Sequence, residues 1–110
     1  KRFRVQNASM SGRLVYLKNG VEVPVPAGSF VPFEIAPSYN RIGTIAIDDN
    51  GVFNLRLRSE YQYSWAVDIV KFQYTEGGVI YEKTYDSLAE LYNALASGSG
   101  VVVLEEQIQE

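Results

Sequence analysis

The segment from Phe53 to Arg58 alternates strictly between apolar and polar residues, and this period of two constrains the fold more than any other feature of the chain. Phe53, Leu55 and Leu57 take alternate positions, with polar side chains between them. Successive side chains of a β-strand point to opposite faces, so the pattern predicts a strand with one buried and one solvated face. Similar alternation recurs elsewhere, which predicts a mainly β chain.

The polar stretch 48–51, Asp-Asp-Asn-Gly, precedes this strand and allows two interpretations. Asn50 and Gly51 both tolerate positive φ, so they favour a type I′ turn and a β-hairpin. Carboxylate and amide oxygens also bind calcium, which makes Asp48, Asp49 and Asn50 the candidate metal ligands. An EF-hand loop needs an oxygen ligand at its fifth position, but an apolar residue falls there when counting starts at either aspartate. We therefore prefer the turn, with a metal site as the alternative.

Strand signals recur along the chain between short turn signals. Segment 21–25 alternates valine with glutamate and proline, and proline cannot donate to a ladder, so this segment is expected to be an edge strand or extended coil. In segment 61–74 the apolar phase slips near Ile69, which indicates a β-bulge or burial on both faces. The other strands are expected at residues 11–17, 30–35, 41–48, 51–58, 79–85 and 101–106.

Residues 87–97 carry the clearest helical signal. Ser87 and Glu90 fit a capping box, in which each side chain accepts from a backbone donor of the first turn. Gly98 is expected to end the helix in a left-handed conformation. Such a short helix is not stable alone in water, so it should pack on the sheet. The apolar stripe that would make this contact comprises Leu88, Leu91, Tyr92 and Leu95.

Length and turn spacing together predict one domain. The chain has 110 residues, which is within the usual size of a domain. Turn signals every 8–12 residues or so are typical of β-sandwiches. The expected fold is mainly β: a single-domain antiparallel β-sandwich of about seven strands, with one short α-helix at about 87–97. In this domain, 1–110, residues 1–10 would form an N-terminal arm and residues 105–110 a polar exit segment.

The composition limits the chemistry that the chain can perform. It contains 0 His and 0 Cys, which excludes Ser-His, Cys-His and the usual zinc chemistry. Carboxylates are spread over several segments, and no recognisable motif holds two of them together. Asp68 is notable because it lies in the apolar run WAVDIV, where a buried carboxylate would need a partner such as arginine. We therefore expect no enzymatic activity and no cofactor.

The charges are distributed unevenly, with 8 Lys+Arg and 5 Asp+Glu in residues 1–60 but 2 and 8 in residues 61–110. No sustained basic face is visible, so nucleic acid is not an expected partner. No run of 18 apolar residues is present either, so a membrane span is not expected. The basic start, with Lys1, Arg2 and Arg4, is either a solvated end or a surface for head-to-tail contacts between subunits.

Aromatic residues supply the second candidate interaction surface. Tyr63 and Trp65 share one strand face, and Tyr81 and Tyr85 share another. Such a surface could contact a carbohydrate or a protein. The alternative is cross-strand packing, with the hydroxyl groups reaching water.

Several of these motifs resemble those of a known family. SGRLVYLKNGVEVPVPAGSFVPFEI, residues 11–35, resembles the opening of transthyretin-like, or carboxypeptidase-regulatory-like, domains, and the turn-to-aromatic stretch 49–55 resembles their middle. The hydroxyisourate hydrolases of this superfamily use histidines, which this chain lacks. The C-terminal part is similar to N-terminal domains of bacteriophage side tail fibres at Gly78, Ile80, Tyr81, Glu82, Ser87, Leu88, Leu91 and Tyr92. The strand VVVLEE that follows departs from that pattern.

The tail-fibre resemblance implies a homotrimer that attaches a fibre to the virion, with tail proteins or copies of itself as partners. The first hypothesis is therefore a non-catalytic structural module, such as a virion-attachment or connector domain. The second is a bacterial cell-surface or periplasmic domain that binds glycan or protein. The third is a carboxylate enzyme, which needs a positioned acid–base pair.

Overall fold

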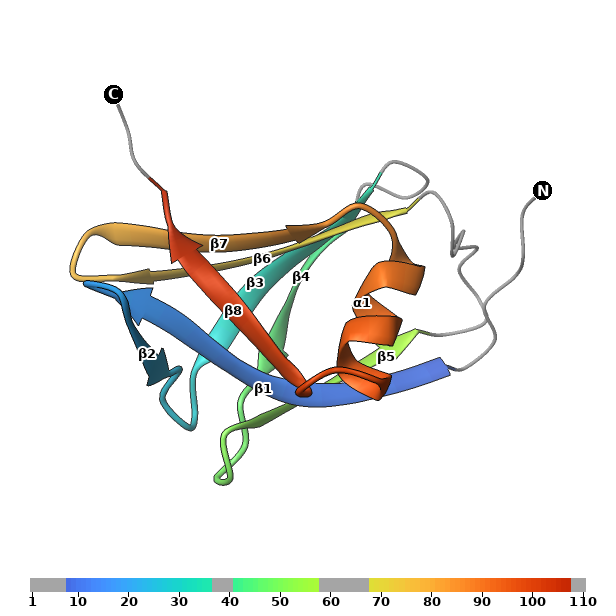
Figure 1. Cartoon of the computed structure of the whole chain (residues 1–110), viewed down its shortest axis with the longest axis horizontal. Coiled ribbons are helices and arrows are strands. Elements are labelled where there is room, and N and C mark those ends of the chain that lie inside the picture. Colours follow the sequence, from blue (N-terminus) through green and yellow to red (C-terminus); the bar gives the residue numbers. More distant parts are fainter. Residues whose placement is uncertain (1–7, 37–40, 58–67, 108–110) are drawn as a thin grey trace.

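The computed structural model describes residues 8–36, 41–57 and 68–107. Within these ranges the chain forms eight β-strands and one α-helix (Figure 1). The mainly β class with one short helix is thus confirmed. The elements are β1 (Ala8–Lys18), β2 (Val21–Pro24), β3 (Phe30–Ala36), β4 (Arg41–Ala46), β5 (Val52–Leu57), β6 (Ile69–Glu76), β7 (Val79–Tyr85), α1 (Leu88–Ala96) and β8 (Val101–Glu106).

The strands form one curled sheet in the order β2-β1-β8-β7-β6-β3-β4. On the edge of β1 opposite β8, β5 pairs with the first half of β1 and β2 with the second half. The sheet curls far enough for Ile47, which follows β4, to form a bridge with Phe53 of β5. The predicted sandwich is not confirmed, because a continuous hydrogen-bonded path connects the strands.

One pair of strands departs from the antiparallel arrangement that we predicted. β1 and β8 run parallel, with Arg13 opposite Val101 and Tyr16 opposite Leu104. β8 then leaves β1 and pairs antiparallel with β7 at Glu105 and Glu106. Parallel partners cannot be joined by a tight turn, so this pairing between the two ends of the chain leaves no local signal in the sequence.

The core fills the inside of the curl and follows the period of two within each strand. Val31 and Ile35 of β3 are buried as predicted, and Phe33 between them is partly buried against the core. Two aromatic residues lie directly opposite glycines: Phe53 opposite Gly12, and Phe33 opposite Gly43. A glycine leaves space for a ring from the neighbouring strand, so these pairs let the sheet bend tightly.

Helix α1 begins as predicted and ends differently. The Ser87 hydroxyl accepts a hydrogen bond from the Glu90 N–H at 3.2 Å, and Leu88 and Leu91 are fully buried. The C-cap, however, is Ser97 and not Gly98. Its backbone N–H and its hydroxyl both donate to the Asn93 carbonyl oxygen. Serine thus satisfies this carbonyl, and the helix ends without a left-handed glycine at position 98. The rest of the predicted stripe is less buried, since Tyr92 is 47% exposed.

The predicted turn between β4 and β5 is present, but the expected hairpin ladder is not. Between described residues the contact is the isolated bridge from Ile47 to Phe53, and β5 pairs with β1 instead. The turn type also differs from the predicted one. Gly51 has a positive φ of 77°, whereas the φ of Asn50 is not positive. The Gly51 N–H donates to the Asp48 carbonyl oxygen at 3.0 Å. A left-handed glycine after such a turn is typical of longer hairpin loops. The two-residue turn with positive φ at both positions occurs instead between β1 and β2, at Asn19 and Gly20.

The predicted bounds differ from the observed ones near both ends of the chain. The N-terminal arm is shorter than residues 1–10 because β1 begins at Ala8, and β8 extends to Glu106 into the predicted exit segment. β2 is an edge strand, as its prolines predicted. The first half of segment 61–74, residues 61–67, lies outside the described residues, and with it the part of the predicted phase slip that precedes Ile69.

Candidate functional site

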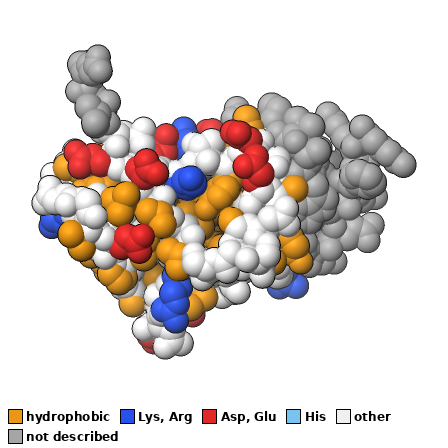
Figure 2. Space-filling view, in the orientation of Figure 1, with side chains coloured by type: hydrophobic (Ala, Val, Ile, Leu, Met, Phe, Trp, Pro, Cys, Tyr) orange, Lys and Arg blue, Asp and Glu red, His pale blue; other side chains and the backbone are white. Residues whose placement is uncertain are grey.

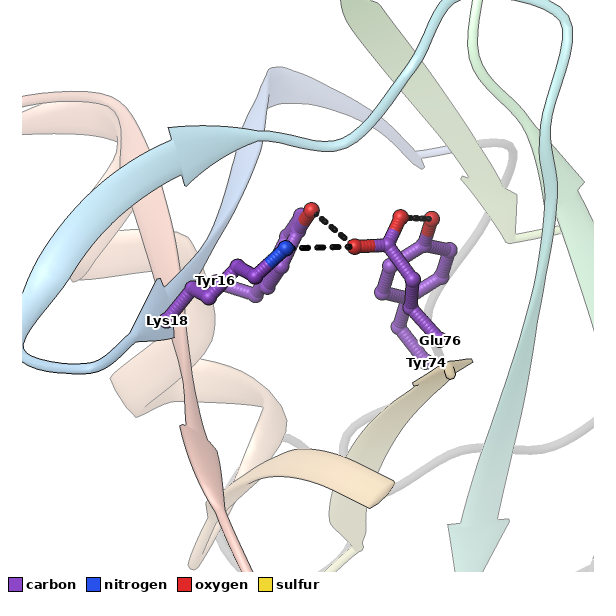
Figure 3. A network of polar contacts seen from close by, with 4 residues as sticks. All are labelled: Tyr16, Lys18, Tyr74 and Glu76. Atoms are coloured by element: carbon purple, nitrogen blue, oxygen red, sulfur yellow. Dashed lines mark hydrogen bonds and ion pairs between the residues drawn. The ribbon is translucent and has the colours of Figure 1, made fainter. Parts of the chain in front are cut away.

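A polar cluster lies on the inner side of the curled sheet, where the β1–β2 and β6–β7 hairpins approach each other (Figure 3). Tyr16 and Lys18 come from the end of β1, and Tyr74 and Glu76 come from the end of β6. Each pair is two positions apart on its strand, so both of its side chains point to the same face. We call these four residues the tyrosine–carboxylate cluster.

Glu76 is the centre of this cluster. The Tyr16 hydroxyl donates to its Oε2 at 2.5 Å, and the Tyr74 hydroxyl donates to its Oε1 at 3.0 Å. The Lys18 ammonium nitrogen lies 3.9 Å from Oε2 at the solvent side, where an ion pair contributes little to stability. Each carboxylate oxygen therefore accepts one hydroxyl. The bond from Tyr16 ties β1 to β6, and the bond from Tyr74 lies within β6.

Three tyrosine rings surround the carboxylate on its inner side. The Tyr16 ring centroid lies 5.1 Å from that of Tyr74 and 4.9 Å from that of Tyr81. Tyr16 and Tyr81 are only 3% and 4% exposed. The tilted rings thus form the end of the core, and the carboxylate closes it towards solvent.

The hydrogen bonds fix the charge state of the cluster. The bond to Glu76, assisted by burial, raises the pKa of Tyr16 to about 12. The bonds from Tyr16 and Tyr74 lower the pKa of Glu76, and burial is the main reason why the pKa of Tyr74 is raised. Near neutral pH the carboxylate is therefore ionised and the phenols are protonated. The arrangement suits two charge-assisted hydrogen bonds better than proton transfer.

We expect the folded state to lose stability at both ends of the pH range. Because the folded pKa of Glu76 is lowered, its stabilisation exists above the ordinary value of 4.5 and is lost as pH falls below it. Because the folded pKa of Tyr16 is raised, its stabilisation exists below 10.0 and is lost as pH rises from there towards about 12. Thermal unfolding followed by circular dichroism over both ranges would measure these losses.

Two variants separate the loss of stability at acid pH from the loss at alkaline pH. Glu76→Gln should weaken the acid dependence of the melting temperature, and Tyr16→Phe should weaken the alkaline one. The exposed residue Asp49 provides the matched control, Asp49→Asn, which should leave both unchanged. An acid dependence in Glu76→Gln equal to that of the unaltered chain would contradict the role of the cluster.

One of the three predicted metal ligands at the β4–β5 turn, Asp48, uses its carboxylate in the turn itself. Oδ1 of Asp48 accepts from the backbone N–H groups of Asn50 and Val52. The Arg13 guanidinium donates to the Asn50 carbonyl oxygen at 2.7 Å and places a positive charge beside it. Within the described ranges, no group of three or more His, Cys, Asp or Glu residues could hold a metal ion. The observed contacts are those of the turn interpretation.

The predicted interaction residues fall into two groups. Tyr81 is a core residue, so its ring is packed and not offered to a partner. Tyr85 is partly buried against the core, with the Lys83 ammonium 5.4 Å from its ring centroid. Asp68, expected to need a partner if buried, is fully buried and has one. The other predicted interaction residues lie outside the described ranges: Lys1, Arg2, Arg4, Tyr63 and Trp65.

The sequence did not reveal the cluster as a unit. Tyr16 and Glu76 are 60 positions apart, and their contact depends on how the sheet curls. The available signal is weak: a tyrosine stands two positions before a charged residue at the end of each of two strands. Neither spacing indicates which strand lies opposite.

Comparisons with known proteins do not assign the chain to a family. No family model matches the chain, no curated protein matches it, and no solved structure matches it. Among the described residues, no helix is long and apolar enough to cross a membrane.

Proposed function

We propose that the chain is a non-catalytic module that acts by joining proteins. The observation that carries the proposal is the pairing within the tyrosine–carboxylate cluster. Both Glu76 oxygens accept hydroxyl groups of the fold itself, and the shifted pKa values of Glu76 and Tyr16 hold each group in one charge state near neutral pH. These contacts support a structural role, because a general acid or base needs a pKa near the working pH.

The specific form of this proposal is a virion-attachment or connector domain of a phage tail fibre. Its support is the resemblance of residues 78–92 to tail-fibre N-terminal domains, together with the capped helix over Leu88–Ala96. The partners would be tail proteins or copies of the chain, and the resemblance implies a trimer. A bacterial surface domain that presents aromatic residues has less support, since one of its four aromatic candidates, Tyr81, is buried.

The test uses the full-length product of the gene and intact particles of its source. Native mass spectrometry should give the mass of three copies, and antibodies raised against residues 8–107 should label the end of the fibre that meets the particle. A monomeric product that labels no particle would contradict the proposal.

A further inference from the structure

The outer side of the β1–β8 pair carries an apolar surface. Val15 and Leu17 of β1 and Val101 and Val103 of β8 lie there, each half-buried. Val15 and Val103 are directly opposite in the parallel ladder. We call these four residues the β1/β8 face, and Figure 2 shows hydrophobic side chains gathered over these two strands. Hydrophobic surface in a continuous patch is typical of protein contacts.

The two ends of the β1/β8 face carry opposite charges. At one end lies Arg13, exposed and opposite Val101. One nitrogen of its guanidinium donates to the Asn50 carbonyl oxygen, and the group carries further N–H donors. At the other end, four residues or about 13 Å along β1, Leu17 lies opposite Glu22 of β2. Glu105 directly follows the last residue of the β1–β8 ladder, so the second end has carboxylates on both sides of β1.

The acidic end contains an unfavourable pairing. Glu105 lies directly opposite Glu82 in the β7–β8 ladder, and like charges in that position destabilise a sheet. Glu82 accepts a hydrogen bond from the Gln73 amide at 3.1 Å. The ion pair found between described residues joins Lys18 and Glu76, so no cation of the described chain pairs with Glu22, Glu82 or Glu105. This end is therefore suited to a cation supplied from outside.

We propose that the β1/β8 face binds the same face of a second copy of the chain. The two copies are related by a two-fold axis that lies between the two faces and runs perpendicular to the strands. Such a rotation makes the strands of the two copies antiparallel. It places Val15 and Val103 of one copy against the same two residues of the other. It also brings Arg13 of each copy towards the acidic end of the other. An isologous contact must be self-complementary, and here one rotation satisfies both the apolar centre and the charges.

The size of the face sets the expected strength of this contact. Three strands over five residues cover roughly 240 Å² per copy, less than a third of a standard interface. The dimer is therefore weak, and added salt weakens it further by screening the exposed ion pairs. The pairing goes beyond the proposed function, since it names a contact between two copies that needs neither a trimer nor a virion.

A charge swap tests this pairing. Arg13→Glu should abolish association, because the introduced carboxylate would face two others, and Glu22→Arg with Glu105→Arg should abolish it for the converse reason. An equimolar mixture of the two variants should associate again, because each contact then joins opposite charges. Sedimentation equilibrium of the 110-residue chain at low salt measures all three samples, and circular dichroism verifies that each variant is folded.

Two further variants keep the test decisive. Arg56 is exposed on β5 and lies opposite Ser9, beyond the face; Arg56→Glu makes the same charge change and should leave association intact. Arg13→Gln keeps a polar side chain and should weaken association with loss of its salt dependence. The proposal is overturned if the unaltered chain stays monomeric at millimolar concentration, or if the mixture associates no better than its components. A three-copy mass for the 110-residue chain itself would overturn the two-fold contact while agreeing with the proposed function.

Discussion

Replacing Phe53 by alanine should lower the free energy of unfolding by about 3–5 kcal/mol, the usual cost of deleting a buried ring. Phe53 is fully buried, and its ring centroid lies 5.6 Å from that of Phe72 at a tilt of 57°. It also lies opposite Gly12 of β1 and bridges to Ile47. The truncation therefore leaves a cavity where the two ends of the curled sheet meet, and the surrounding strands cannot collapse into it without opening the curl.

Chemical denaturation measures this loss, and the chain offers a matched control. Phe30 is 72% exposed at the start of β3, so Phe30→Ala makes the same chemical change without a cavity. Surface substitutions of this kind usually alter stability by less than about 0.5 kcal/mol. Equal losses in the two variants would show that Phe53 is not a core residue at the closure of the sheet.

Gly12→Ala should have the second-largest effect, a loss of about 1–3 kcal/mol from overpacking. A Cβ at this position would lie 2.7 Å from Cδ2 of Leu95 and 2.8 Å from the carbonyl oxygen of Gly100. That carbonyl accepts the Arg13 N–H at 2.9 Å. The added methyl group would thus push the end of α1 outward and strain the start of the parallel β1–β8 pairing. Thermal unfolding should shift downward by about 4–8 °C per kcal/mol.

A second glycine separates crowding from a general effect of removing glycine from a strand. At Gly43 the nearest atom to a new Cβ is Cε1 of Phe33, at 3.2 Å, and no backbone atom lies close. Gly43→Ala should therefore cost less than Gly12→Ala, because a ring can shift more easily than a backbone carbonyl. If the two variants unfold at the same temperature, crowding between α1 and β1 does not explain the loss of stability in Gly12→Ala.

Features set by neighbours in the sequence were predictable. The capped start of α1 follows from Ser87 and Glu90 at a spacing of three, and the turn at residues 48–51 follows from polar residues between two apolar runs. The edge position of β2 follows from its prolines. In each case the residues that decide the structure lie within a few positions of one another.

Finer local details were wrong where a side chain competed with the backbone preference. At the β4–β5 turn the Asp48 carboxylate accepts two backbone N–H groups, and Asn50 therefore does not adopt the positive φ that Asn-Gly usually allows. At the end of α1 the Ser97 hydroxyl bonds to the Asn93 carbonyl oxygen, which removes the need for a left-handed residue at Gly98. Short polar side chains often compete with regular backbone patterns in this way.

The closure of the sheet and the tyrosine–carboxylate cluster depend on pairings between distant segments. The parallel contact of β1 with β8 joins residues near 13–16 to residues 101–104, and the sequence has no turn that specifies it. The bond between Tyr16 and Glu76 depends in turn on the curl that this pairing helps to create. Alternation indicates which face of a strand is buried, but it does not indicate which strand lies beside it.

The proposed pairing of two copies through the β1/β8 face makes a prediction for each residue of that face. A dilution series of ¹⁵N-labelled chain, followed by amide NMR spectra, tests it most directly because it locates any contact by residue. We predict concentration-dependent shifts at Arg13, Val15, Leu17, Glu22, Val101, Val103 and Glu105, and none around Phe30. Shifts confined to other surfaces, or spectra that do not change with concentration, would contradict the claim.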